Sequence, residues 1–272
     1  MKKVFSSKTL VAFVFLTFVA ATIYVAVMYM LAPSEPVATD QNIRLKGDYA
    51  LMLLQCALGT VIMMLPEILR RKCKIAIPQG MVAALAVFLY CAIYLGEVQS
   101  FYFRIEHWDT LLHTFSGVAL GAIGVSIIGL LHKSKSVSIS PAFVALFAFC
   151  FAVAAGTVWE IYEYAVDSIT NLNMQKYMLE SGEALVGQAA LADTMKDILV
   201  DTLGALAISV VAYVSMKRKE GWLERMQLRR NRPELVPQPA YAAQKIPLVP
   251  QVQPAIVAAD NSPIPEPLPL AL

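Results

Sequence analysis

Residues 157–167 read TVWEIYEYAVD and close a long apolar run that begins at Pro141. Glu160, Glu163 and Asp167 follow an i, i+3, i+7 spacing, which places three carboxylates on one face of a helix. They fall where a membrane-spanning helix should leave the bilayer, and carboxylates at that depth are unfavourable unless they serve a site. We therefore expect acidic or His-bearing segments of other spans to converge on this face and form one polar site.

The composition is that of a polytopic membrane protein. Of the 272 residues, 58% are hydrophobic and only 15% are charged, and the mean hydropathy is +0.60. Soluble domains average about 45–50% apolar and about 25% charged residues. The net charge of +2 gives no indication of a nucleic-acid partner. The four cysteines lack CxxC spacing, so neither a disulfide framework nor a thiolate metal site is expected.

Six apolar runs are each close to the roughly 20 residues that cross a bilayer as a helix. We expect an all-α transmembrane domain over residues 1–215, with spans at about 10–31, 49–69, 81–96, 110–131, 141–164 and 194–213. The first run follows three lysines, as in a signal peptide. It is too long for an ordinary apolar signal core and no clear cleavage site follows it, so we expect an uncleaved span, with cleavage as the alternative.

Basic residues predict the orientation of the spans. Lys and Arg clusters fall on one side of a six-span path, at residues 2–8, 70–74, 133–135 and 217–219. By the positive-inside rule, we expect a multi-pass protein of the plasma membrane with both termini in the cytoplasm. We also expect a basic amphipathic helix at 216–232 on the cytoplasmic surface. The Pro-rich tail at 233–272 should be disordered, either as a solvated segment or as a docking peptide for a cytoplasmic partner.

The opposite ends of spans four to six carry the remaining unusual polar residues. Asp109 and His113 lie one helical turn apart, and Asp193, Asp197 and Asp201 follow an i, i+4, i+8 spacing. Asp109 and Asp193 also suit the capping of helix N-termini, and Asp197 fits a capping box with the residue after Asp193. Capping cannot account for the carboxylates of span five, because there the C-terminal end of the helix faces this side and its dipole disfavours negative charge.

The depth of these residues also suggests a single site. At a rise of 1.5 Å per residue, His113 and Glu160 lie roughly 28 Å from the basic ends of their spans, and Asp201 lies roughly 22 Å from its own. All three then fall in the outer third of a hydrocarbon core about 30 Å thick. Gly117, Gly121 and other small residues continue the face of His113, which favours close approach of these spans.

The pattern over about residues 100–215 resembles an uncharacterised bacterial membrane-spanning family, the YjdF-like proteins: it reads HWDTLLH at 107–113, ExxE at 160–163 and DxxxDxxG at 197–204. It is also similar in outline to the VanZ-like proteins, whose pattern runs Asp-Lys-x-x-His, Glu-x-x-Gln and Asp-x-x-x-Asn-x-x-Gly. The resemblance implies five shared positions: Asp109, His113, Glu160, Asp197 and Gly204. The YjdF-like family implies no activity, and the VanZ-like one implies a role in glycopeptide tolerance at the envelope. This sequence departs from the VanZ-like pattern at Thr110, Glu163 and Asp201, where that pattern has Lys, Gln and Asn.

The two added carboxylates favour a metal or proton role. Our leading hypothesis is a metal-dependent enzyme that acts on an outer-leaflet lipid or envelope precursor with Zn²⁺, Mn²⁺ or Mg²⁺. The expected metal ligands are Asp109, His113, Glu160 and Asp197. Glu163 or Asp201 is expected to act as general base or to hold a ligand in place. The alternatives are a proton- or ion-coupled transporter, and a non-catalytic membrane scaffold or envelope-stress protein.

Overall fold

The structure is a computed structural model in which residues 7–34, 44–132, 139–179, 181–218 and 228–230 are described. Its elements in chain order are α1 (Ser7–Leu31), α2 (Lys46–Ile68), the π-helix η1 (Leu69–Cys73), β1 (Ile75–Ala76), α3 (Gln79–Leu89), the π-helix η2 (Tyr90–Val98), α4 (Phe101–Arg104), α5 (Trp108–His132), α6 (Pro141–Thr170), α7 (Gln188–Arg218) and β2 (Arg229–Arg230). β1 and β2 form one short antiparallel pair.

Six helices in the described part of the chain are long and apolar enough to cross a membrane, at the positions of the six predicted spans. Their outer surfaces carry large apolar side chains, such as Leu16, Ile161 and Leu199, which are 59–66% exposed. Several carboxylates, including Glu160 and Asp197, are buried inside. This distribution is the reverse of that in a soluble protein and suits a bundle whose surroundings are lipid. The fold is thus all-α and polytopic apart from the short strand pair.

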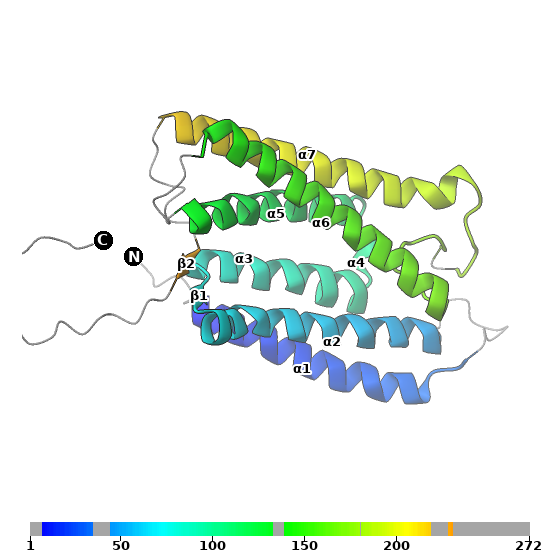
Figure 1. Ribbon diagram of the computed structural model, residues 1–272. Coiled ribbons are helices and arrows are strands. Elements are labelled where there is room, and N and C mark those ends of the chain that lie inside the picture. Colours follow the sequence, from blue (N-terminus) through cyan, green and yellow to red (C-terminus); the bar gives the residue numbers. More distant parts are fainter. Residues whose placement is uncertain (1–6, 35–43, 133–138, 180, 219–227, 231–272) are drawn as a thin grey trace, which may run out of the picture. The chain divides into compact units, whose positions relative to one another are not determined.

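The helices pack as two groups of three (Figure 1). In the first group, α1, α2, α3 and η2 share an apolar core around Phe18, Cys56 and Ile93. In the second group, α5, α6 and α7 pack closely on one another around Val125, Ala148 and other small apolar residues. The C-terminal part of α6 crosses toward the first group (Figure 1), where the segment that follows it packs on α2. The second group holds the residues predicted to form the site.

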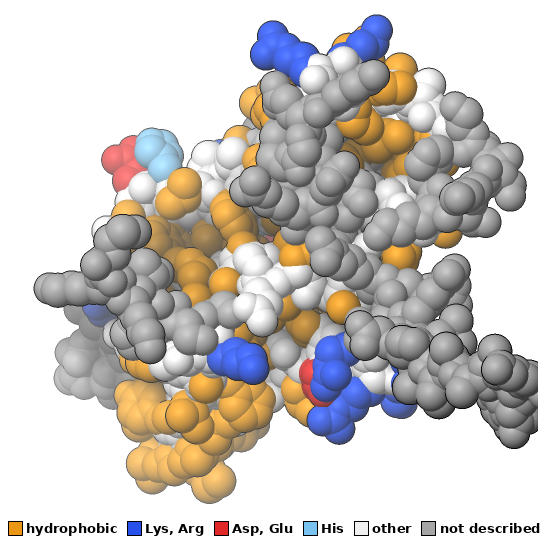
Figure 2. Space-filling model, turned by 90° about the vertical axis from the view of Figure 1, so that its left-hand side faces the viewer, with side chains coloured by type: hydrophobic (Ala, Val, Ile, Leu, Met, Phe, Trp, Pro, Cys, Tyr) orange, Lys and Arg blue, Asp and Glu red, His pale blue; other side chains and the backbone are white. Residues whose placement is uncertain are grey.

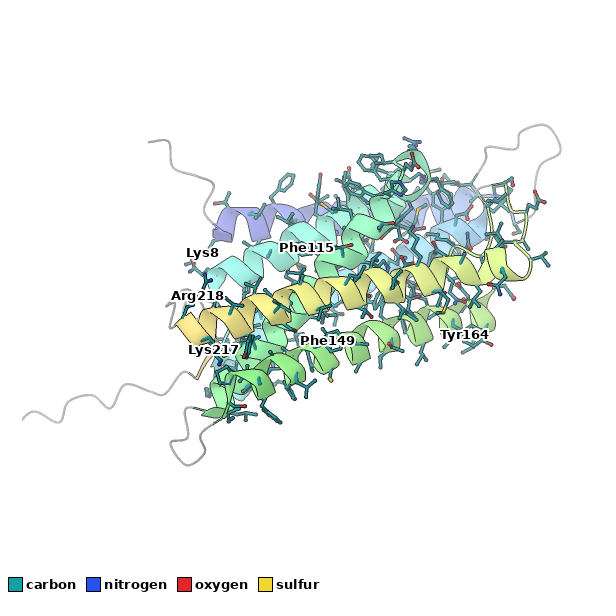
Figure 3. All side chains as sticks on the ribbon, turned by 90° about the horizontal axis from the view of Figure 1, so that it is seen from above. Lys8, Phe115, Phe149, Tyr164, Lys217 and Arg218 are labelled. Carbon is teal, nitrogen blue, oxygen red and sulfur yellow. The ribbon has the colours of Figure 1, made fainter. Side chains whose placement is uncertain are left out.

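Clusters of Lys and Arg residues lie at one end of the bundle, which we call the basic end. Figure 3 places Lys8, Lys217 and Arg218 together at this end and Tyr164 at the opposite end. Figure 2 looks at the basic end, where Lys and Arg side chains stand in separate groups around the rim. At this end Glu67 pairs with Arg70 at 2.6 Å. This clustering of basic side chains is the pattern from which the cytoplasmic side was predicted.

Two helices are longer at the opposite end than the hydropathy predicted. α6 begins at Pro141 as expected, with the Ser140 hydroxyl accepting the backbone N–H of Phe143 at 3.2 Å, but it continues to Thr170 rather than 164. α7 begins at Gln188 rather than 194. Asp193 therefore lies inside the helix, and its predicted role as an N-terminal cap, together with the capping box at Asp197, is wrong. The added residues of α7, QAALAD at 188–193, are mostly good helix formers, which explains the earlier start of that helix.

The predicted surface helix at 216–232 lies mostly outside the described residues. In its described part, residues 216–218 continue α7 and Arg229–Arg230 form strand β2. The predicted disordered tail at 233–272 lies wholly outside the described residues.

Candidate functional site

His113 lies at the centre of a cluster of carboxylates contributed by α5, α6 and α7. Four carboxylates approach its two ring nitrogens within 3.9 Å: Asp109, Glu160, Asp197 and Asp201. The imidazole is nearly enclosed, with 12% of its side chain exposed. The three helices predicted to converge therefore do meet at one polar centre, in the half of the bundle away from the basic end.

One edge of the His113 ring faces a possible position for a metal ion. Nε2 lies 3.7 Å from Oδ1 of Asp109, one turn earlier on α5, and 3.9 Å from Oδ2 of Asp197 on α7. One ligand atom from each of these three residues lies within 4.8 Å of the other two. Ligands of a tetrahedral metal with bonds of about 2.0–2.2 Å are spaced somewhat more closely than this. A small inward movement of the two carboxylates would bring all three ligand atoms within bonding distance of one metal ion.

The other edge of the ring is held by Asp201. Nδ1 of His113 lies 3.2 Å from Oδ2 of Asp201, and the hydroxyl of Ser116 donates to Oδ1 of the same carboxylate at 2.5 Å. The Ser116 oxygen also lies 2.8 Å from the carbonyl oxygen of His113, so its single proton serves one acceptor at a time. A carboxylate that accepts from Nδ1–H fixes the imidazole orientation and leaves Nε2 free as a ligand.

Glu160 is the carboxylate with the least support from hydrogen bonds. It is 3% exposed, and neither of its oxygens has a hydrogen-bond partner among the described residues. Its nearest contact in the cluster is Nδ1 of His113, at 3.9 Å. Oδ1 of Asp197, which is 2% exposed, also lacks a partner in the described part of the chain. Buried carboxylate oxygens without donors are unfavourable, so this cluster needs a proton or a cation beyond those described.

Glycines allow the helices to approach closely enough for these contacts. A Cβ on Gly117 of α5 would overlap the backbone of Asp201, and one on Gly204 of α7 would lie 2.5 Å from the carbonyl oxygen of Thr114. On α6, a Cβ on Gly156 would lie 2.8 Å from Oδ2 of Asp201. Small residues at helix contacts allow such close backbone packing in membranes. The expected close approach of spans four to six is thus explained at atomic detail.

The other two carboxylates of the 157–167 stretch lie outside the His113 contacts. Glu163 accepts a hydrogen bond from Nε1 of Trp159, one turn earlier on α6, at 2.9 Å. Asp167 is buried, and its two oxygens accept the backbone N–H groups of Met174 and Gln175, each at 2.9 Å. Asp167 therefore organises the loop that follows α6 and is not part of the polar centre, although the helical spacing had placed it on the same face.

The loop between α6 and α7 is tied to the first helix group by a buried ion pair. Nζ of Lys176 lies 3.1 Å from Oε2 of Glu97 at the end of η2, and the two side chains are 16% and 7% exposed. The same ammonium group lies 4.9 Å from the ring centre of Tyr102 on α4. Burial acts to lower the pKa of Lys176, but the charge and hydrogen bond of Glu97 outweigh it, aided by Glu163 and Asp109, so the pKa is raised.

Replacing Lys176 with methionine is expected to lower the free energy of unfolding by about 2 kcal/mol at neutral pH, because Glu97 stays buried without its charged donor. Since folding raises the pKa of Lys176, its contribution is fully present below the unfolded lysine pKa of about 10.4 and is lost as the pH rises through the folded pKa. The free energies of unfolding of the wild type and the variant, measured by denaturant titration, should therefore differ by a constant amount from about pH 7 to 10 and converge above that range.

Lys46→Met provides the matched control for this experiment. Lys46 also lies over a tyrosine ring, 5.5 Å from the centre of Tyr29, but no carboxylate lies within ion-pair distance of it in the described part of the chain. Its variant should change the free energy of unfolding by less than about 0.5 kcal/mol. Equal effects of the two substitutions would contradict the role given to the Lys176–Glu97 pair.

Sequence reasoning missed three residues of this region. Ser116 follows His113 by three positions on the same helix face, so helical periodicity was a sufficient signal for it. Glu97 and Lys176 are 79 residues apart, in a span terminus and in a loop, and nothing in one sequence indicates that they meet.

Comparison with known proteins adds a family but no activity. Residues 10–218 match the family described as "Predicted membrane protein (DUF2238)". An uncharacterised protein from Thermotoga maritima is 29% identical over 140 residues, which is 52% of this chain and 64% of that protein, so the match spans less than two thirds of the relative's length. No solved structure matches the chain. The family match includes all six candidate spans almost completely. The chain belongs to the DUF2238 family of predicted membrane proteins.

Proposed function

We propose that this protein is a metal-dependent membrane enzyme that acts on an envelope lipid or lipid-linked precursor. The observation that carries this proposal is the surplus of buried negative charge around one imidazole. Four carboxylates approach His113, and three of their buried oxygens, two on Glu160 and one on Asp197, lack hydrogen-bond donors among the described residues. A single imidazolium against four carboxylates leaves three negative charges unbalanced, whereas a divalent cation with the neutral imidazole as ligand leaves two and also gives the buried oxygens a ligand partner.

The proposed ligands are Asp109, Nε2 of His113 and Asp197, the three groups that lie within reach of one ion. One imidazole nitrogen with two carboxylate oxygens suits Zn²⁺ or Mn²⁺, and Mg²⁺ less well because it prefers oxygen ligands. Three protein ligands leave coordination positions open, which is the arrangement of catalytic rather than structural zinc sites. A metal in such a site supplies an activated water or polarises a phosphoryl or carbonyl oxygen.

We assign each of the other acidic residues a role according to its position relative to His113. Asp201 orients His113 through Nδ1 and is a positioning residue. Glu160, predicted from sequence as a ligand, lies nearer to Nδ1 than to the Nε2 edge, so we assign it to charge balance and to holding a proton. Glu163 remains the candidate general base, since its hydrogen bond to the exposed Trp159 ring leaves acceptor positions available.

The proposed orientation follows from the charges at the two ends. If the basic end faces the cytoplasm, as the positive-inside rule predicts for a plasma-membrane protein, both termini are cytoplasmic and the His113 centre opens toward the outer leaflet. Substrates at that depth are lipids or lipid-linked envelope precursors. The VanZ-like role in glycopeptide tolerance stays a prediction from resemblance.

Metal content tests the proposal directly. Elemental mass spectrometry of the purified protein is expected to show about one divalent metal per chain. Asp197→Asn should lose it, because it removes a ligand charge, and Asp201→Asn should bind it about 10–100-fold more weakly, since it disturbs the orientation of His113. Glu160→Gln should retain the metal better than Asp197→Asn does. Glu106→Gln, whose side chain is 87% exposed, is the control and should match the wild type.

The two alternative functions are separated by the same experiment. Metal-free wild-type protein that is folded after growth with Zn²⁺, Mn²⁺ and Mg²⁺ would overturn the enzyme proposal. The carboxylates would then have to hold protons, as in a proton-coupled transporter, and proton uptake by reconstituted vesicles under a pH gradient would distinguish transport from a purely structural network. A metal-loaded protein should next be screened for release of phosphate from phosphorylated lipids.

A further inference from the structure

A second feature, separate from the His113 centre, is a cavity of about 1780 Å³ among α1, α2, η2, α4 and the loop after α6. Thr17 and Tyr24 of α1, Met52 of α2, and Glu97 at the end of η2 are among its walls. None of the four carboxylates that surround His113 lines it. The cavity is larger than the roughly 300–1,000 Å³ of most small-molecule pockets.

The cavity runs along the C-terminal half of α1. Its lining extends from Thr17, near the middle of α1, to Leu31 at the end of that helix and on to Ser34. The 14 helical steps from Thr17 to Leu31 correspond to about 21 Å. One leaflet contributes about 15 Å to the hydrocarbon core, so this depth matches an acyl chain with part of its headgroup. Small and apolar side chains, including Ala20 and Met52, line the cavity.

The cavity is lined by the guanidinium of Arg44, two of whose N–H donors have no partner in the described part of the chain. Nη1 of Arg44 donates to the carbonyl oxygen of Val98 at 3.0 Å and lies 3.7 Å from the sulfur of Met52. Nη2 donates to the hydroxyl of Ser100. These partners are uncharged, and no carboxylate in the described part of the chain lies within ion-pair distance of Arg44. Among the described residues, the Nε–H and one Nη2–H have no acceptor, and Nε and Nη2 are the two nitrogens of the edge with which arginine binds phosphate bidentately.

The charges around the cavity also favour an anion. Arg44 and Arg104 line it together with two carboxylates, Asp48 and Glu97. Glu97 is neutralised by Lys176 at 3.1 Å, and Asp48 accepts the backbone N–H of Leu45 at 2.7 Å. Counted over the described residues, one positive charge is therefore left in excess. A cavity with apolar side chains along α1 and polar and cationic side chains elsewhere in its lining matches the two parts of an anionic lipid.

We propose that this cavity binds one anionic phospholipid, with an acyl chain along α1 and the phosphate on the free edge of Arg44. The lipid is held by protein groups that the metal site does not use, so this proposal stands whether or not His113 binds a metal. Apolar contacts of the acyl chain provide most of the binding free energy, and Arg44 provides the preference for a negatively charged headgroup.

Native mass spectrometry of the delipidated, full-length protein in non-ionic detergent tests this, with phosphatidylglycerol and phosphatidylcholine of the same chain length as probes. The wild type is expected to bind one phosphatidylglycerol about tenfold more tightly than phosphatidylcholine. Arg44→Gln should abolish that preference and leave phosphatidylcholine binding unchanged. Ala20→Leu, which narrows the cavity at an exposed position of α1, should weaken the binding of both lipids about tenfold.

Two substitutions and one soluble probe serve as controls. Lys46→Gln removes a neighbouring cation that does not line the cavity, and Ala12→Leu adds the same bulk to an exposed position of α1 outside it; both should behave as wild type. Glycerol 3-phosphate should not compete, because it lacks the acyl chain. Equal binding of the two lipids by the wild type, an unchanged preference in folded Arg44→Gln, unchanged binding in Ala20→Leu, or competition by glycerol 3-phosphate would each overturn the proposal.

Discussion

Replacing His113 with leucine is expected to lower the free energy of unfolding by about 3–5 kcal/mol, since removing one partner of a buried ionic network leaves the others uncompensated. The four carboxylates around the ring would lose the group that separates them. Leucine is similar in size to histidine, so little of the loss would come from a cavity. Denaturant titrations of the purified protein in mixed micelles at neutral pH measure this change, and elemental analysis of the same samples should show that the metal is lost.

His107→Leu is the matched control for this substitution. Its ring is 73% exposed, and the ion pair that it makes among the described residues is with the exposed Glu106 at 3.3 Å, so the variant should stay within about 0.5 kcal/mol of the wild type. Adding Glu160→Gln to His113→Leu should recover part of the stability, because it removes one buried negative charge. If His113→Leu were as stable as the wild type, the carboxylates would have to be compensated without His113, and the central place given to the imidazole would be wrong.

Gly117→Ala is expected to destabilise the bundle by about 1–3 kcal/mol through overpacking and to weaken metal binding at the same time. The added Cβ would lie 2.9 Å from the carbonyl carbon of Asp201 and 3.0 Å from its Cα. Because both sides of this contact are helix backbone, α5 and α7 must move apart. That movement also separates His113 on α5 from Asp197 and Asp201 on α7, so both effects should appear in one variant, measured by thermal unfolding and by metal content.

Replacing Gly80 with alanine should have the opposite effect on the free energy of unfolding. A Cβ at Gly80, near the start of α3, would meet nothing within 4 Å. Alanine is a better helix former than glycine by up to about 1 kcal/mol, so Gly80→Ala should stabilise the protein or leave it unchanged. A Gly117→Ala protein with wild-type stability and metal content would show that α5 and α7 can accommodate the added methyl group, contrary to the packing described above.

The number and positions of the helices could be predicted because the bilayer imposes a length on each apolar run. The boundaries at the end opposite the basic end could not. Residues 165–170 and 188–193 lie beyond the apolar part of their spans, and their helical state depends on local propensity and on the contacts of Asp167 with the following loop. The π-helical winding of η2, one of whose carbonyls accepts Nε1–H of Trp108 at 3.3 Å, likewise has no signature in the apolar pattern.

For the site, the sequence identified most of the residues that meet, but it missed Ser116, wrongly included Asp167, and did not show how the carboxylates are arranged around the ring. Counting residues from the basic end gives depth along each helix, and depth was enough to predict that Asp109, His113, Glu160, Asp197 and Asp201 lie close together. Rotation about each helix axis is set by packing, here by Gly117 and Gly204 at the contact of α5 and α7. That rotation decides that Asp201 meets Nδ1 while Asp197 faces Nε2.

Six spans, basic clusters at one end of the bundle and a group of His and carboxylates toward the other could all be predicted from the amino-acid sequence, since hydropathy, helix rise and charge are properties of single segments. Four features required the three-dimensional packing: the arrangement of carboxylates around His113, the exclusion of Asp167 from the centre, the Lys176–Glu97 pair and the cavity beside Arg44. Each of these depends on contacts between segments distant in the chain, which helix packing and loop geometry fix and local sequence does not encode.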